Sequence, residues 1–158
     1  MFSSSNFSVI TWKAYNNDQA PSVDGYKIGK HPNGNDVYIG KGTYSGQTGP
    51  GRIQLSPSIG FYYSHSGYER YITTGVQYLV VGSTCNCSWV QNSGGKPVPN
   101  AVAIQDASVD NFVFWIGRGT LPGGVTIGKI VNSMSSIWYC DAAGNDIYET
   151  FYEVLACV

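Results

Sequence analysis

The stretch Ile39-Gly40-Lys41-Gly42-Thr43 returns further along the chain as Ile116-Gly117-Arg118-Gly119-Thr120. An offset of 77 positions relates the two stretches, and the same offset carries Trp12 onto Trp89. We therefore interpret the chain as a tandem repeat in one gapless register, with residues 1–83 as the first copy and residues 84–158 as the second. The same offset also relates Gly46 to Gly123, Gly51-Arg52-Ile53 to Gly128-Lys129-Ile130, Ser56 to Ser133, Tyr62 to Tyr139, Gly67 to Gly144, and Tyr71 to Tyr148.

The matched residues fall into two kinds. Repeated Trp, Ile and Tyr are interpreted as core positions, and repeated Gly as backbone positions at turns, bulges or close approaches. At two matched positions only the positive charge is kept: Lys41 with Arg118, and Arg52 with Lys129. This pattern indicates that the charge or its donor hydrogens matter there. A solvated strand residue remains the alternative for one residue of each pair.

Composition and residue alternation both favour strands. The 158 residues include 20 Gly and 14% aromatic residues but only 12% charged residues, which is typical of short strands joined by tight turns. Period-2 alternation predicts an all-β fold without an amphipathic helix. The expected strands are 9–14, 36–41, 52–55, 60–63 and 77–81 in the first copy and 88–92, 101–105, 112–118, 129–132, 137–140 and 152–157 in the second, with turns at 32–35, 46–51, 94–95 and 123–124.

The sequence thus predicts two tandem antiparallel β units related by pseudo-twofold symmetry, with a boundary near residues 82–86. A sheet built from one copy alone would have exposed strand edges. We therefore expect the copies to pack together by exchanging their N-terminal strands.

Charge and hydropathy argue against several partners. The net charge is −1 and the pI is about 6.0, so the chain lacks the basic surface that nucleic acid binding requires. No segment approaches the roughly 18 apolar residues of a membrane helix. The first twelve residues lack the basic region and apolar run of a signal peptide, which predicts a cytoplasmic or non-classically secreted protein.

The four cysteines are Cys85, Cys87, Cys140 and Cys157. A bridge between Cys85 and Cys87 would be strained at this spacing. A zinc site would require Cys140 and Cys157 to fold back toward the C-N-C segment, and that segment lacks the usual two-residue spacer. We therefore expect no metal, and free buried thiols in a reducing compartment. The sequons at Asn6 and Asn86 matter only in an exported chain.

The ordered motifs of both copies resemble the DM9 repeat, from residue 12 nearly to the end of the chain. The second copy carries Trp89, P-N-A-V at 99–102, W-I-G-R-G at 115–119, G-K-I at 128–130 and Y-E-V-L at 152–155. The first copy keeps Trp12, Y-I-G-K-G at 38–42, P-G-R-I at 50–53 and Y-L-V at 78–80, but reads D-G-Y-K at 24–27 in place of the P-N-A-V box.

The resemblance implies a lectin that binds mannose-type glycans or glycoproteins and uses neither a metal nor another cofactor. An acidic residue after the A-V strand and a basic residue in the P-G-K strand contact the sugar in such proteins. In the second copy these are Lys129 and either Asp106 or Asp110, since this turn is longer than the family's. In the first copy the basic residue is Arg52, whereas the acidic position falls on or near His31, Pro32 and Asn33.

The resemblance therefore implies one good sugar site around Asp106 and Lys129, and one altered site around Arg52. A carboxylate and a cation form charge-assisted hydrogen bonds to sugar hydroxyls, and weak single sites gain from multivalency, within the chain and in a homodimer. Aromatic side chains would cover the apolar face of the sugar, although each is also a core candidate. The candidates are Tyr44, Tyr62, Tyr63, Trp138 and Tyr139.

Simpler interpretations and other function classes compete with a sugar site. Asp106 and Asp110 suit an ordinary turn, Lys129 suits a solvated strand, and His31 and His65 suit exposed loops. No nucleophile or phosphate-binding motif is present, which predicts that the chain is not an enzyme. The alternatives are an interaction module or a partner of pore-forming segments and, less favoured, a glycoside hydrolase. A hydrolase would draw a carboxylate pair from Glu69, Asp141, Asp146, Glu149 and Glu153.

Overall fold

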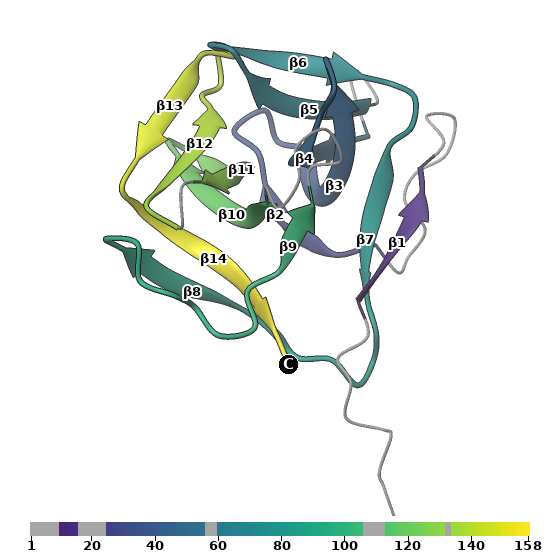
Figure 1. Cartoon of the computed structure of the whole chain (residues 1–158). Coiled ribbons are helices and arrows are strands. Elements are labelled where there is room, and N and C mark those ends of the chain that lie inside the picture. Colours follow the sequence, from purple (N-terminus) through teal and green to yellow (C-terminus); the bar gives the residue numbers. More distant parts are fainter. Residues whose placement is uncertain (1–9, 16–24, 56–59, 106–112, 132–133) are drawn as a thin grey trace, which may run out of the picture.

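The computed structural model describes residues 10–15, 25–55, 60–105, 113–131 and 134–158, which form two seven-stranded antiparallel sheets and no helix. Figure 1 shows the first sheet at the right and the second at the left. The first sheet contains β1 (Ile10–Ala14), β2 (Lys27–Lys30), β3 (Asp36–Tyr44), β4 (Gln47–Gln54), β5 (Gly60–His65), β6 (Tyr68–Ile72) and β7 (Gln77–Val81). The second contains β8 (Cys87–Ser93), β9 (Ala103–Gln105), β10 (Val113–Leu121), β11 (Gly124–Val131), β12 (Ser136–Cys140), β13 (Asp146–Glu149) and β14 (Phe151–Cys157).

The two sheets have the same topology. The first runs β1-β7-β3-β4-β5-β6, with β2 beside β3, and the second runs β8-β14-β10-β11-β12-β13, with β9 beside β10. Each strand of one copy therefore has a counterpart in the other. The expected all-β fold with two tandem antiparallel units is confirmed.

The expected exchange of N-terminal strands is wrong. β1 pairs with β7 from Ile10↔Val81 to Ala14↔Gln77, and β8 pairs with β14 from Cys87↔Cys157 to Ser93↔Phe151. In each copy, the first strand thus pairs with the last strand of the same copy. This pairing covers the edge that we expected a strand of the other copy to cover.

The copies associate through a shared core and through a short β-bridge between Tyr68 and Asn145, where the Glu69 backbone amide donates to the Gly144 carbonyl oxygen at 2.8 Å. A shared core joins Val37, Ile39 and Leu79 of the first copy to Ile116 and Leu155 of the second, all nearly inaccessible to solvent. Each copy also has a smaller core of its own, around Phe61 in the first and Ile137 in the second. Burial of this kind is the main favourable contribution to folding.

Repeated glycines allow close packing in the middle of each sheet. A Cβ on Gly51 would lie 2.3 Å from the Tyr62 carbonyl oxygen and 2.7 Å from Phe61 Cζ, and one on Gly128 would lie 2.7 Å from the Trp138 carbonyl oxygen. The expected turn at 46–51 is therefore too long. Only Ser45 and Gly46 turn the chain, and the later glycines belong to β4.

The repeat is not gapless. Arg52 pairs with Tyr62 and Lys129 pairs with Trp138, so the counterpart of Tyr62 is Trp138 and not Tyr139. The connection after β11 has one residue fewer than the connection after β4, and the turn after β12 restores the offset. The connection before β14 is again one residue shorter, since Gly40 pairs with Tyr78 and Gly117 with Val154. These changes fall between strands, where insertions are tolerated.

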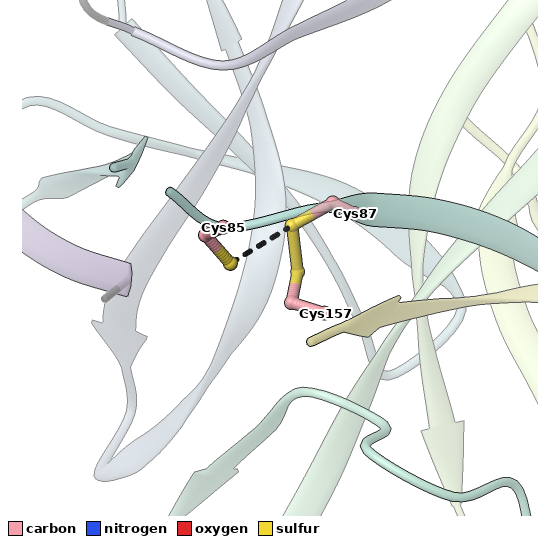
Figure 2. The surroundings of a disulfide bond; sticks show 3 residues. All are labelled: Cys85, Cys87 and Cys157. Carbon is pink, nitrogen blue, oxygen red and sulfur yellow. Dashed lines mark hydrogen bonds between the residues drawn. A yellow bond between two sulfur atoms is a disulfide. The ribbon is translucent and has the colours of Figure 1, made fainter. Parts of the chain in front are cut away.

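A disulfide joins β8 to β14, contrary to the expectation of four free thiols. Cys87 and Cys157 are directly paired across the two strands, with their Cα atoms 4.0 Å apart, and this places their sulfur atoms within bonding reach. Cys85 and Cys140 are free and buried. Figure 2 shows the Cys85 side chain beside the Cys87–Cys157 bridge. The sulfur atoms of Cys85 and Cys87 are 4.0 Å apart, and those of Cys85, Cys87 and Cys157 all lie within 4.8 Å of one another.

Candidate functional site

Arg52 lies on β4 at one wall of a cavity of about 400 Å³. The residue is only 4% exposed, and its guanidinium carbon lies 4.2 Å from the centre of the Tyr62 ring on β5. A cation held over an aromatic face in this way gains electrostatic attraction from the ring. The cavity is also lined by His31, Pro32, Asn33, Gln54 and, from the second copy, Ala142.

A chain of hydrogen bonds fixes the Arg52 guanidinium. Nη1 donates to Gln54 Oε1, which also accepts from Asn33 Nδ2 at 2.8 Å. Nη2 donates to Glu69 Oε1 at 3.1 Å. Arg52 is thus held by its own strand, by the loop before β3 and by β6.

Glu69 supplies a carboxylate that the sequence analysis assigned to no sugar site. The acidic position expected near His31 and Asn33 holds no carboxylate, but Glu69 approaches Arg52 from β6. Burial raises the pKa of Glu69, and the positive charge of Arg52 opposes that rise. The first copy therefore has an ion pair of a cation and a carboxylate, formed by residues of β4 and β6, which lie on either side of β5.

His31 is buried, contrary to the expectation of an exposed loop residue. Only 5% of it is accessible, because Gly124 of the second copy packs directly on the 30–32 backbone. The backbone amide of Asn33 donates to His31 Nδ1 at 3.2 Å. Burial, reinforced by the charge of Arg52, lowers the His31 pKa to about 4, so the imidazole is neutral near pH 7.

Lys129 occupies the counterpart position on β11 and lines a second cavity of about 360 Å³. Its ammonium donates to Gln47 Oε1 of the first copy at 3.0 Å. It also lies 4.4 Å from the ring centre of Tyr63 and 5.3 Å from that of Phe114. Like Arg52, Lys129 is almost fully buried, with 7% exposed.

Each cavity is lined in part by residues of the other copy. The end of β5 and the turn after it line the Lys129 cavity with Ser64, Ser66 and Gly67, and the turn after β12 lines the Arg52 cavity with Ala142. Asp146 of the second copy ties these turns together, because its carboxylate accepts from Ser64 Oγ at 2.7 Å and from the Gly67 amide at 2.9 Å. Neither copy alone contains a complete cavity.

The other sequence candidates lie at different places. Asp106 and Asp110 fall outside the described residues, so an acidic partner of Lys129 there stays a prediction. Tyr63 and Tyr139 are core residues, whereas Trp138 lines the Lys129 cavity. Tyr44 packs edge-on against His65, with 5.2 Å between the ring centres.

The second pair of matched cations lies over tryptophan rings. Lys41 lies 4.7 Å from the Trp12 ring centre, and Arg118 lies 4.7 Å from the Trp89 ring centre. Arg118 also donates from Nε and Nη2 to the two carboxylate oxygens of Glu153, at 3.0 and 2.8 Å, beside an open cleft of about 580 Å³. A cation over a partly buried tryptophan explains why the charge is kept at these positions.

Comparison with known proteins supports the resemblance that the sequence motifs indicated. The family model described as the DM9 repeat matches residues 54–149, from the end of β4 to the end of β13. No curated protein matches the chain. Among the described residues, no helix has the length and apolar character needed to cross a membrane.

Proposed function

The chain belongs to the DM9-repeat family, and we propose that it binds mannose-type glycans through the Arg52 and Lys129 cavities. The main support is the recurrence, at matched strand positions, of a buried cation that lines an open cavity. A buried cation has lost its water, so it is costly to keep unless other groups stabilise it. Two such residues in one small chain favour a binding role over a purely structural one.

The chemistry of the cavities suits sugar hydroxyls. The Lys129 ammonium can donate to hydroxyl oxygens, and a carboxylate nearby can accept hydroxyl hydrogens. Trp138 lines the Lys129 cavity and Tyr62 lines the Arg52 cavity, where aromatic surface suits the C–H side of a sugar. Because the cations themselves supply the polar contacts, we propose that binding requires no metal.

Two cavities in one chain favour multivalent recognition. A glycan or glycoprotein that reaches both cavities would bind more tightly than a single sugar, because the second contact is intramolecular. A homodimer would double the number of sites again. We propose no nucleic acid partner, consistent with the net charge of −1.

We propose that the chain binds sugars without cleaving them. A glycoside hydrolase places two carboxyl groups on either side of the bond it breaks. Of the carboxylates considered for that role, Glu69 is paired with Arg52, Glu153 with Arg118, and Asp146 with Ser64 and Gly67. Each of these three carboxylates thus has partners within the chain, and its position can be explained without a catalytic role.

The proposal is tested by a glycan array with the intact chain, with a chelator present, followed by titration of the best ligands. We expect mannose-type glycans to bind and Lys129→Ala to weaken them. Lys41→Ala is the matched control, because it also removes a strand cation but one that lies over Trp12 and outside both cavities. Full binding by Lys129→Ala would refute the site, and release of free sugar would refute the non-enzymatic role.

A further inference from the structure

Two residues that line the Arg52 cavity have N–H groups without a hydrogen-bond acceptor in the described part of the chain. Arg52 Nε and His31 Nε2 are both buried and have no hydrogen-bond partner among the described residues. Since the Asn33 amide donates to His31 Nδ1, the proton of the neutral imidazole lies on Nε2. Two buried N–H groups on residues that line one cavity thus lack an acceptor. Such groups are rare in folded proteins, and a ligand that accepts from them removes the cost of leaving them unpaired.

Three side-chain oxygens around this cavity already accept hydrogen bonds. Gln54 Oε1 accepts from both Asn33 and Arg52. Asn33 Oδ1 accepts from the Asn35 amide at 3.0 Å, and Glu69 Oε1 accepts from Arg52 at 3.1 Å. A neutral hydroxyl brings a donor hydrogen that would compete for these acceptors, whereas an oxyanion brings acceptors only. The arrangement therefore favours an anionic group over a hydroxyl.

We propose that the Arg52 cavity binds the carboxylate of an acidic sugar, a uronic acid, while the Lys129 cavity takes the neutral sugar. The inference rests on the proposed carbohydrate-binding function and assigns a ligand class to one of its two sites. Carboxylate oxygens would accept from Arg52 Nε–H and His31 Nε2–H, and charge-assisted bonds of this kind are about twice as strong as neutral ones. Pro32, Tyr62 and Ala142 supply the less polar part of the lining for the sugar ring.

The charges of the site are consistent with this ligand. Glu69 contacts the guanidinium at Nη2, so the carboxylate of the ligand would meet the other edge, at Nε, and the imidazole. His31 contributes as a neutral donor, so its contribution does not require an acidic solution. The other carboxylate of the neighbouring turn, Asp141, accepts from the Ala143 and Asn145 amides and stabilises that turn.

The test compares two sugars that differ only at C6: D-mannuronate and D-mannose. Both are titrated calorimetrically into the intact chain and into Lys129→Ala, which leaves the Arg52 cavity as the remaining site. Arg52→Lys and His31→Phe are then added separately to Lys129→Ala. The fold already accommodates a lysine at the matching position, Lys129 on β11, so Arg52→Lys removes the Nε donor while keeping the charge. Near-ultraviolet circular dichroism checks that each variant is folded.

We expect Lys129→Ala to bind mannuronate at least about tenfold more tightly than mannose, and each added substitution to weaken mannuronate by about tenfold. Equal affinities for the two sugars in Lys129→Ala would overturn the inference, as would unchanged mannuronate affinity in both double variants. The proposed function fails separately, if the wild-type chain binds no mannose-type glycan or if Lys129→Ala binds mannose as the wild type does.

Discussion

Gly51 shows how a single residue limits the packing of the first copy. A methyl group there would meet the Tyr62 carbonyl oxygen at 2.3 Å and the Phe61 ring at 2.7 Å, and neither is the free end of a flexible side chain. We expect Gly51→Ala to lower the free energy of unfolding by about 2–3 kcal/mol through overpacking. Urea denaturation followed by tryptophan fluorescence measures the loss.

Gly46→Asn is the matched control for Gly51→Ala. Gly46 has a φ of 84°, but a Cβ atom at this position would have no other atom within 4 Å, and asparagine tolerates this conformation better than most residues. We expect a loss below about 1 kcal/mol. If Gly51→Ala were as stable as Gly46→Asn, the Phe61 ring and its surroundings would be able to move and accommodate a methyl group at little cost.

His31 makes stability depend on pH. Its pKa is about 4 in the folded chain and about 6.5 in the unfolded chain. Between these values the unfolded chain binds a proton that the folded chain does not, so the free energy of unfolding falls as the pH drops from about 6.5 to 4. We expect His31→Gln to reduce this fall, as measured by urea denaturation across the interval. Identical pH profiles for the two chains would contradict the buried, neutral state of His31.

At the residue scale, the sequence allowed the cations of the site to be predicted but not their partners. Arg52 and Lys129 stood out because two copies keep a charge at one matched position. Glu69 gave no such signal as a partner of Arg52, because the two are 17 positions apart and meet only through the pairing of β4, β5 and β6. His31 lies where Gly124 of the other copy packs on the backbone of residues 30–32. The alternation of residues along one strand could not predict this contact between copies.

At the element scale, alternation found β3, β7 and β10, found only the last part of the Gly-containing strands β4 and β11, and missed short polar strands. The expected strands 36–41 and 77–81 correspond to β3 and β7. β2, β6 and β13 were missed because they are short and mostly polar or exposed, so their sequences alternate weakly. Pairing with a neighbouring strand, and not local preference, determines that these segments are extended.

The β8–β14 disulfide replaces an apolar pair of the other copy. Cys87 and Cys157 occupy the positions that Ile10 and Val81 occupy in β1 and β7. The bridge closes a loop with a sequence separation of 70, for which the chain-entropy model gives about 4 kcal/mol. We expect Cys87→Ile with Cys157→Val to keep the fold but lower the free energy of unfolding by about 2–4 kcal/mol. Urea denaturation with and without a reductant provides the internal control: the reductant should destabilise only the wild-type chain.

At the scale of the whole molecule, the two copies depend on each other for both stability and sites. The shared core contains Ile39 and Leu79 from one copy and Ile116 and Leu155 from the other. Asp146 additionally bonds to the turn of the first copy through Ser64 and Gly67. The boundary near residue 83 therefore separates two sequence repeats, but the cavities belong to the pair.

This dependence predicts the behaviour of the separated halves. Residues 84–158 alone would expose Ile116 and Leu155 and leave the Asp146 carboxylate without its partners in the first copy. Losing that apolar contact costs about 25 cal/mol for each Å² exposed, a large share of the stability of a small domain. We therefore expect the isolated half to lack a cooperative unfolding transition and to show poor dispersion in its amide NMR spectrum.

Mixing the two halves provides the complementary measurement. If the shared core drives their association, residues 1–83 and 84–158 expressed separately and refolded together should form a one-to-one complex in sedimentation. That complex should regain glycan binding, because each cavity needs a turn from the other half. The disulfide lies entirely within residues 84–158 and cannot link the halves, so recovery would come from non-covalent contacts alone. A folded, monomeric 84–158 fragment that binds glycans by itself would show that the cavities are complete within one copy.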